Sequence, residues 1–254
     1  MKICRYEYAG NIRYGVADPV HGVVREIEGN PFDGVILTGR EFTRTGVTIL
    51  PPVSPSKIVA IGLNYKDHAF EMGKKIPEEP MMFIKPSSAV LAPDGEIVYP
   101  EASRRVDHEA ELGVVIGRET CRVKAADARS HILGYTCIND VTARDLQAKD
   151  VQYTRAKGFD TFAPIGPWVE TDLDTSSLFI RCRVNGVVKQ DGNTREMGAN
   201  PFTLVEFISH VMTLYPGDVI ATGTPPGVGP LHPGDTVEVE IEGIGVLRNR
   251  VVAQ

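Results

Sequence analysis

The stretch from Arg105 to Gly117, Arg-Val-Asp-His-Glu-Ala-Glu-Leu-Gly-Val-Val-Ile-Gly, predicts a buried strand that carries two carboxylates, Glu109 and Glu111, near its start. Side chains on a strand alternate between its two faces, so residues two apart point the same way. Two carboxylates directed into one pocket repel each other unless a cation or a proton lies between them. A third carboxylate, Asp140, ends another apolar run. Three acidic oxygen donors without a thiolate or imidazole suit a hard divalent ion, Mg²⁺ or Mn²⁺.

The spacing of Glu109 and Glu111 does not by itself establish a site. Near the C-terminus Glu238, Glu240 and Glu242 alternate with apolar residues, a pattern that predicts the solvated face of an amphipathic strand. For an isolated Glu-X-Glu this is the commoner outcome, and on spacing alone it stays open for Glu109 and Glu111. The strand of Glu109 and Glu111 differs because it continues into a nearly all-apolar run.

Length and composition are those of a globular protein. The 254 residues suffice for one large domain with a small appendage, and contents of 42% hydrophobic and 24% charged residues are ordinary. A net charge of -6 argues against nucleic acid as a partner, and four scattered cysteines predict neither disulfides nor a zinc site. The first residues form no apolar signal core and no run approaches a membrane span. We therefore expect a cytoplasmic protein without a membrane partner.

Strands outnumber helices along the chain, and short turns between them favour antiparallel pairing. Residues 1–50 consist of short β runs separated by Gly, Asn and Pro, and Pro51 to Pro55 resembles a linker. We therefore predict an α+β fold, mostly β, with a small N-terminal β-rich domain (1–50) and a main domain (51–254). Asn185-Gly186 predicts a type I′ hairpin. The predicted helices cover residues 64–72, 142–149 and 202–214.

Other candidate residues can be explained either by a functional role or by an ordinary surface or structural role. His68 and Glu71 lie three apart, which places them on one face of a helix, where the carboxylate orients the imidazole; an exposed surface pair is the commoner outcome. The glycine-rich run 221–229 matches neither a P-loop nor a dinucleotide fingerprint. Its backbone amides and the hydroxyls of Thr222 and Thr224 suit a carboxylate, and a purely structural turn is equally open. The local sequence around Lys157 predicts an ordinary exposed lysine.

The remaining histidines receive no role. A regular strand would turn His108 away from the side of Glu109 and Glu111. The others are predicted to be turn or surface residues: His21, His131, His210 and His232.

Taken in order, these residues resemble the fumarylacetoacetate hydrolase family over roughly residues 57–252. The ordered set of segments is specific, although no single segment is. The segments are Gly62-Leu-Asn-Tyr-Lys-Asp-His-Ala-Phe-Glu-Met72, Phe83-Ile-Lys-Pro86, His108-Glu-Ala-Glu-Leu-Gly-Val-Val-Ile-Gly117, Asn139-Asp-Val-Thr-Ala-Arg-Asp-Leu-Gln147, Lys157-Gly-Phe-Asp160 and Gly223-Thr-Pro-Pro-Gly-Val-Gly229.

The resemblance implies a mixed β-sandwich roll with few helices, usually a homodimer. It implies one Mg²⁺ or Mn²⁺ per subunit, bound by Glu109, Glu111 and Asp140. It also implies that His68 and Glu71 form an acid/base dyad on a segment that acts as a lid in relatives.

Further site residues follow from the same resemblance. Lys157 and Gln147 are implied to line the reaction centre, and Arg144, Gly223 and Thr224 to contact the substrate. Two departures limit the transfer. Fumarylacetoacetases proper carry a longer N-terminal domain and a further acidic ligand, and Leu63 stands where acylpyruvate hydrolases carry Arg.

The implied activity is that of a metal-dependent enzyme on 2-oxo or 2-hydroxydienoic (di)carboxylic acids, through a metal-stabilised enolate. We expect a 2-hydroxyhepta-2,4-diene-1,7-dioate-type isomerase or a C–C bond hydrolase. An oxaloacetate decarboxylase or tautomerase is the alternative within the family. A non-catalytic protein that binds a metal and an oxo acid is an alternative of another class, and a structural Ca²⁺ site is a weaker one.

Overall fold

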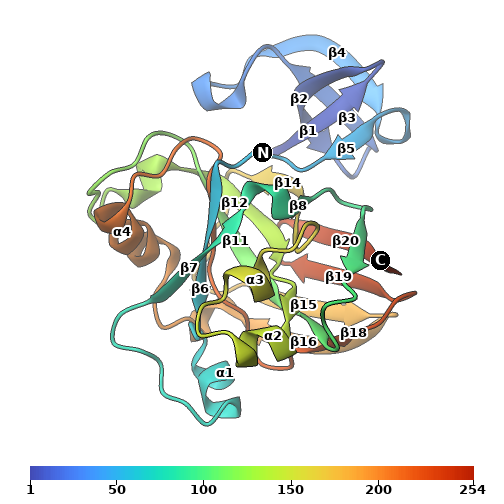
Figure 1. Cartoon of the computed structure of the whole chain (residues 1–254). Helices are drawn as coiled ribbons and strands as arrows, with labels where there is room; N and C mark the ends of the chain where they lie inside the picture. The colour runs from blue at the N-terminus through green and yellow to red at the C-terminus, as the bar shows by residue number, and fades with distance from the viewer.

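The fold is described from a computed structural model that covers residues 1–254. It contains a twelve-stranded, a five-stranded and a three-stranded sheet with only a few short helices, so the prediction of an α+β fold, mostly β, is confirmed. Figure 1 shows the strands of residues 1–50 as a lobe at the top and α1 at the opposite end of the molecule. No helix is long and apolar enough to cross a membrane.

The largest sheet runs through the whole molecule in the order β4-β3-β2-β1-β14-β12-β11-β17-β6-β7, with β5 beside β1 and β8 beside β14. Neighbours pair antiparallel, except for the parallel pairs β17–β6 and β14–β8. Its strands are β1 (Lys2–Tyr8), β2 (Asn11–Asp18), β3 (Val23–Ile27), β4 (Leu37–Thr43), β5 (Thr48–Leu50), β6 (Lys57–Gly62), β7 (Met81–Pro86), β8 (Val90–Leu91), β11 (Ala110–Ile116), β12 (Ile132–Asn139), β14 (Ala163–Glu170) and β17 (Val219–Ala221).

The two smaller sheets have the orders β16-β15-β19-β20-β9 and β13-β10-β18. Their strands are β9 (Glu96–Tyr99), β10 (Val106–His108), β13 (Thr142–Ala143), β15 (Phe179–Val184), β16 (Val187–Asn193), β18 (Gly229–Leu231), β19 (Thr236–Ile241) and β20 (Gly245–Ala253). Strands β15 and β16 form the predicted hairpin, with positive φ at both Asn185 and Gly186 as a type I′ turn requires. Residues Thr142 and Ala143, predicted as helix, pair instead with β10.

The helices are short and lie outside the sheets. The α-helices are α1 (Lys66–Glu71), α2 (Arg144–Lys149), α3 (Thr154–Lys157) and α4 (Pro201–Val211), and the 3₁₀ turns are Pro31–Asp33, Arg44–Gly46, Ser87–Ala89, Ala128–His131 and Thr194–Glu196. In α4 the Asn200 side chain accepts hydrogen bonds from the amides of Phe202 and Thr203, and Pro201 occupies the first turn. This helix ends three residues before the predicted Leu214, because Met212 adopts an extended conformation.

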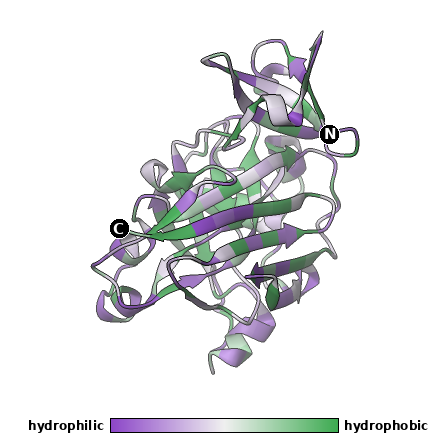
Figure 2. Ribbon diagram, turned by 90° about the vertical axis from the view of Figure 1, so that its right-hand side faces the viewer, coloured by the Kyte–Doolittle hydropathy of each residue, from purple (hydrophilic) through white to green (hydrophobic).

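Both faces of β11 are covered, which explains its all-apolar sequence. Leu112 and Val114 belong to the main core, which the large sheet forms with the five-stranded sheet and α4. Val115 points the other way into a second core, to which Ile3 and Val53 contribute. On β19, in contrast, only alternate residues are buried and the predicted solvated face is confirmed. Figure 2 faces the side of the molecule where β15, β19 and β20 lie, and hydrophobic and hydrophilic residues alternate along the strands there.

Residues 1–50 continue the large sheet, because β1 pairs with β14 at Lys2 and Ile3. The N-terminal amine lies 2.7 Å from Oε1 of Glu170 on that strand. Pro52 and Val53 are buried, so the segment predicted as a linker is packed against the body. A domain boundary near residue 50 stays a prediction.

Candidate active site

Antiparallel pairing of β11 with β12 brings the three predicted carboxylates together. Ala110 pairs with Asn139, and the amide of Asp140 donates to the carbonyl of Glu109 over 2.9 Å. All three carboxylates are buried, and one oxygen of each lies within 4.8 Å of the others. The solvated-face alternative for Glu109 and Glu111 is therefore wrong.

Basic side chains neutralise two of the three carboxylates. Nζ of Lys157 lies 2.8 Å from Glu109 and 2.6 Å from Asp140, and Arg144 lies 2.6 Å from Glu109. Burial alone would raise the pKa of Glu109, but the two cations outweigh burial and lower that pKa to about 2. Lys85 pairs with the other oxygen of Asp140 and is completely buried.

Glu111 has no cationic partner in this cluster. Its one hydrogen-bond donor is the amide of Gly223, 2.8 Å from Oε2. Burial, followed by the negative charges of Asp140 and Glu109, raises the pKa of Glu111 well above its ordinary value. A divalent cation among the three oxygens would remove this repulsion, and a purely oxygen donor set is the one that Mg²⁺ and Mn²⁺ prefer. The residues thus fit such an ion.

Lys157 is not the exposed lysine that its sequence context predicts. It lies at the C-terminal end of α3 with 2% of its surface exposed, and its ammonium is 5.1 Å from the ring centre of Phe83. Burial alone would lower the pKa of Lys157, but the carboxylates of Asp140 and Glu109 raise it. The ammonium is thus a fixed positive charge beside the carboxylates.

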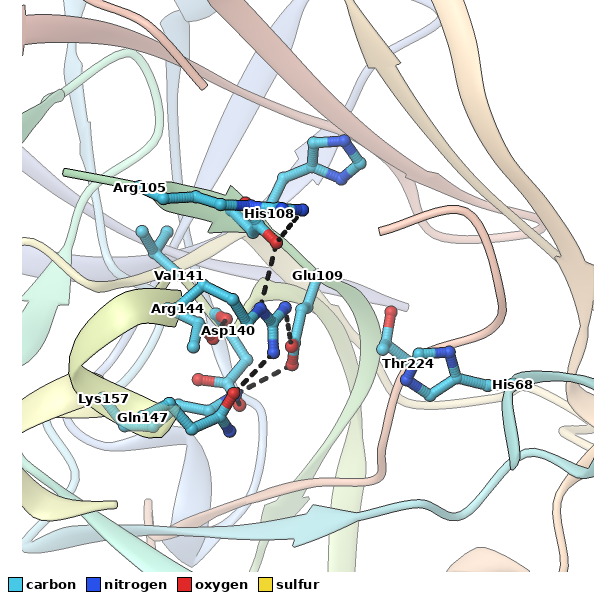
Figure 3. A network of polar contacts seen from close by, with 12 residues as sticks. His68, Arg105, His108, Glu109, Asp140, Val141, Arg144, Gln147, Lys157 and Thr224 are labelled. Carbon is cyan, nitrogen blue, oxygen red and sulfur yellow. Dashed lines mark hydrogen bonds and ion pairs between the residues drawn. The ribbon is translucent and has the colours of Figure 1, made fainter. Parts of the chain in front are cut away.

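His68 approaches the cluster from a separate element, α1. In Figure 3 it extends from the opposite side to Arg144 and Lys157, near Thr224. Nδ1 of His68 lies 3.0 Å from Oε2 of Glu71. His68 is buried and only Glu71 is exposed, so the two residues are not the fully exposed surface pair of the alternative. The Glu71 carboxylate remains partly exposed and accepts from the amide of Gly227 at 3.2 Å, which joins the helix to the glycine-rich run.

The other predicted residues lie in or beside the cavity that the carboxylates and His68 line. Nη1 of Arg144 donates to Gln147 over 2.7 Å and Nε to Asp107 over 2.9 Å. Thr224 lines the site and donates to the carbonyl of Ala110 over 2.8 Å. Thr222, also a candidate, is buried and donates instead to the carbonyl of Leu112. Eight of the ten predicted residues line one cavity of about 90 Å³, and Glu71 and Gly223 contact its walls. A larger cleft, of about 390 Å³ beside residues 1–50, has no such buried cluster.

Gln190 was not predicted from the sequence as a site residue, and it fixes the position of Thr224. Its Oε1 accepts from the amide of Ala110 at 2.9 Å, and its Nε2 donates to Thr224 and to the carbonyl of Pro225, both at 2.8 Å. His108 lies 3.1 Å from the same Oε1 through Nδ1, so this nitrogen carries the proton. His108, which received no role, is therefore a buried donor to Gln190, and burial lowers its pKa.

Few sequence signals mark these missed residues. Gln190 lies in an ordinary hairpin strand, and only the tertiary structure places it beside the site. Lys85 stands within the Phe-Ile-Lys-Pro segment, where a charged residue in an apolar strand was the available signal. Among the other histidines, His131 is half-buried beside Thr120, and the rest are exposed as predicted.

Comparison with known proteins identifies relatives over nearly the whole chain. The fumarylacetoacetate (FAA) hydrolase C-terminal family model matches residues 57–252, and the Rv2993c-like N-terminal model matches residues 1–52. The structure of 5-carboxymethyl-2-hydroxymuconate delta-isomerase from Mycobacterium smegmatis is similar with a TM-score of 0.94, 45% identity and full coverage of both chains. For 2-hydroxyhepta-2,4-diene-1,7-dioate isomerase from Mycobacterium marinum the TM-score is 0.93 at 43% identity, covering 100% of this chain and 99% of that one. Human mitochondrial oxaloacetate tautomerase FAHD2A is 46% identical over 222 residues, 82% of this chain and 71% of that protein.

Proposed function

The chain belongs to the fumarylacetoacetate hydrolase family, and on that basis we propose that it is a metal-dependent enzyme that moves a proton on a 2-oxo or 2-hydroxydienoic dicarboxylic acid. The observation that carries the proposal is the convergence of three buried carboxylates, a buried lysine and a buried histidine on one cavity. The names of the three relatives, two isomerases and a tautomerase, support proton transfer over the other reactions of the family.

Glu109, Glu111 and Asp140 would hold one Mg²⁺ or Mn²⁺ per chain. When bound, the ion supplies a Lewis acid that stabilises the enolate of a 2-oxo acid. Lys157 adds a fixed positive charge to the same region, since its ammonium is held by two of the carboxylates. Charge preorganised in a buried site stabilises a developing negative charge without the cost of reorientation.

His68 is the proposed acid/base group, because it lines the cavity and Glu71 holds its Nδ1. The carboxylate leaves Nε2 to take a proton from one carbon or oxygen of the substrate and return it to another. Arg144, Gln147 and Thr224 are the proposed substrate contacts. A wholly passive binding protein would not need a buried histidine oriented by a carboxylate, which disfavours that alternative.

Hydrolysis of a C–C bond is the second candidate. It would follow if His68 activated a water molecule against a β-diketo acid instead of moving a proton within the substrate. Decarboxylation of an oxaloacetate-like acid would need no water: the C–C bond to the leaving CO₂ would break and its electron pair would form the same type of enolate, which is then protonated. A homodimer is also proposed, from the resemblance to the family, and light scattering coupled to size exclusion tests it.

Turnover assays distinguish these outcomes. The protein is assayed with Mg²⁺ or Mn²⁺ on 2-hydroxyhepta-2,4-diene-1,7-dioate, oxaloacetate and an acylpyruvate, with Glu109→Ala and an EDTA-treated sample as controls. We expect isomerisation or tautomerisation that both controls abolish. Activity that persists in Glu109→Ala would refute the proposal, and hydrolysis of the acylpyruvate alone would establish the second candidate.

A further inference from the structure

We propose that Lys74 binds the outer carboxylate of the substrate, so that the site selects 2-oxo dicarboxylic acids over monocarboxylic acids of equal length. This inference rests on the proposed function, which places the 2-oxo acid end of the substrate at the buried carboxylate cluster. Lys74 lies just beyond α1 and lines the same cavity as that cluster.

Lys74 is the one uncommitted cation of the cavity. The two other strongly basic residues that line it, Arg144 and Lys157, each contact two carboxylates. Nζ of Lys74 has no carboxylate within ion-pair distance and no hydrogen-bond acceptor in the protein. A substrate carboxylate that reaches this end of the cavity would therefore find a cation without a competing partner.

The end of α1 fixes the position of Lys74. The amide of Gly73 donates to the carbonyl of Phe70 over 3.0 Å, and the amide of Lys74 donates to that of Ala69 over 2.8 Å. These two bonds form a Schellman motif, in which the residue after the helix takes a left-handed conformation. Gly73 has φ of +63°, a left-handed conformation that a residue with a Cβ rarely adopts. The backbone of Lys74 is therefore held against the helix that carries His68.

The apolar part of the cavity lining suits a hydrocarbon chain. Met72, Met81, Phe83 and Tyr153 line the cavity together with Lys74, and the rings of Phe83 and Tyr153 meet edge to face at 5.4 Å. The carboxylate cluster is buried whereas Lys74 is exposed, so the cluster forms the inner end and Lys74 the outer end. An inner end where three carboxylates would hold a divalent ion, an apolar lining and an outer cation together match a linear 2-oxo dicarboxylic acid.

The proposed contact should produce a small but measurable preference for the dicarboxylic over the monocarboxylic 2-oxo acid. An ammonium–carboxylate pair at an exposed rim is partly screened by water and salt. With the 2-oxo acid end already anchored, we expect about a fivefold preference, which corresponds to about 1 kcal/mol. The preference should shrink in high salt, because the pair is exposed.

The test compares two ligands that differ only at the far end. Titration calorimetry in the presence of Mn²⁺ measures binding of 2-oxoadipate, 2-oxohexanoate and, as a probe of the inner end alone, oxalate. The variants are Lys74→Ala, Lys74→Glu and, as a matched control, Lys75→Ala, which removes an adjacent exposed lysine that does not line the cavity. We expect the wild type and Lys75→Ala to prefer 2-oxoadipate about fivefold, Lys74→Ala to lose the preference and Lys74→Glu to reverse it, with oxalate binding unchanged.

The outcomes separate the two proposals. If the wild type binds oxalate but Lys74→Ala keeps the preference for 2-oxoadipate, the role of Lys74 is wrong and the proposed function stands. An equal loss in Lys75→Ala would reduce the effect to general surface charge and would also overturn it. If the wild type binds neither oxalate nor either 2-oxo acid, both proposals fall.

Discussion

Nζ of Lys157 lies 2.6 Å from Oδ2 of Asp140 in an ion pair that is almost fully buried. The same ammonium contacts Glu109, so it occupies a position between two of the three carboxylates.

We expect Lys157→Met to lower kcat/KM at least a hundredfold, roughly the value of one preorganised charge in a buried site. Mn²⁺ affinity should not fall, because the two carboxylates lose a competing cation. Calorimetry and turnover assays with Lys149→Met, an exposed lysine, as the control test this. Mn²⁺ affinity that fell together with activity would contradict it.

The dyad predicts unequal effects for its two members. His68→Ala should lower kcat by about a hundredfold or more, the usual value of a general acid/base. Glu71→Gln should lower it by about tenfold, because the amide oxygen still accepts from Nδ1 and only the charge is lost. Mn²⁺ binding should be unchanged in both variants. A Glu71→Gln effect as large as that of His68→Ala would show that Glu71 does more than orient the imidazole.

Gln190 does not line the cavity, and we expect its substitution to lower the stability of the fold. Gln190→Leu leaves the amide of Ala110, the carbonyl of Pro225 and His108 without their partner, so we expect a loss of about 2–4 kcal/mol in the free energy of unfolding. Urea unfolding measures it, with exposed Gln152→Leu as the matched control. A loss no greater than that of the control would show that the network is dispensable.

Asp218 predicts a pH dependence of stability. Burial alone would raise its pKa, but hydrogen bonds from Lys57, Tyr215 and Ser56 outweigh burial and lower the pKa below its ordinary value. Since the folded-state pKa lies below the unfolded one, the stabilisation is present above about pH 4 and is lost as the pH falls through the folded-state pKa.

Asp218→Asn should therefore lower the free energy of unfolding by roughly 2–4 kcal/mol at pH 7 and by less at pH 3. Urea unfolding at pH 7, 5 and 3 measures the difference from wild type, with the exposed Asp94→Asn as control. A deficit of the same size at pH 7 and pH 3 would rule out this carboxylate as the source.

Local patterns in the sequence predicted much of the fold. The strand Lys57–Gly62 and the hairpin at Asn185-Gly186 follow the prediction, because apolar runs and turn residues act over a few positions. The first turn predicted for the second helix forms a strand instead, since Thr142 pairs with Asp107 on β10, 35 residues earlier. Such long-range pairing overrides local propensity.

The site was predicted unevenly for a similar reason. Glu109, Glu111 and Asp140 lie at the ends of apolar strands, a position that the sequence displays. The burial of Lys157 depends on partners 48 and 17 residues away, and that of Lys85 on a carboxylate 55 residues away. A buried lysine is stable only when paired, so its burial follows from tertiary contacts rather than from its neighbours in sequence.

The metal site is tested most directly by titrating the wild type and Glu111→Gln with Mn²⁺ in a calorimeter and by measuring the thermal unfolding of both proteins. The claim is that three buried carboxylates hold one divalent ion and that Glu111 is the one without a protein cation. We predict one Mn²⁺ per wild-type chain and affinity at least about a hundredfold weaker in Glu111→Gln. In EDTA the variant should unfold at the same or a higher temperature than wild type, because a buried, unpaired carboxylate has been removed. Wild-type Mn²⁺ affinity in Glu111→Gln would contradict the account.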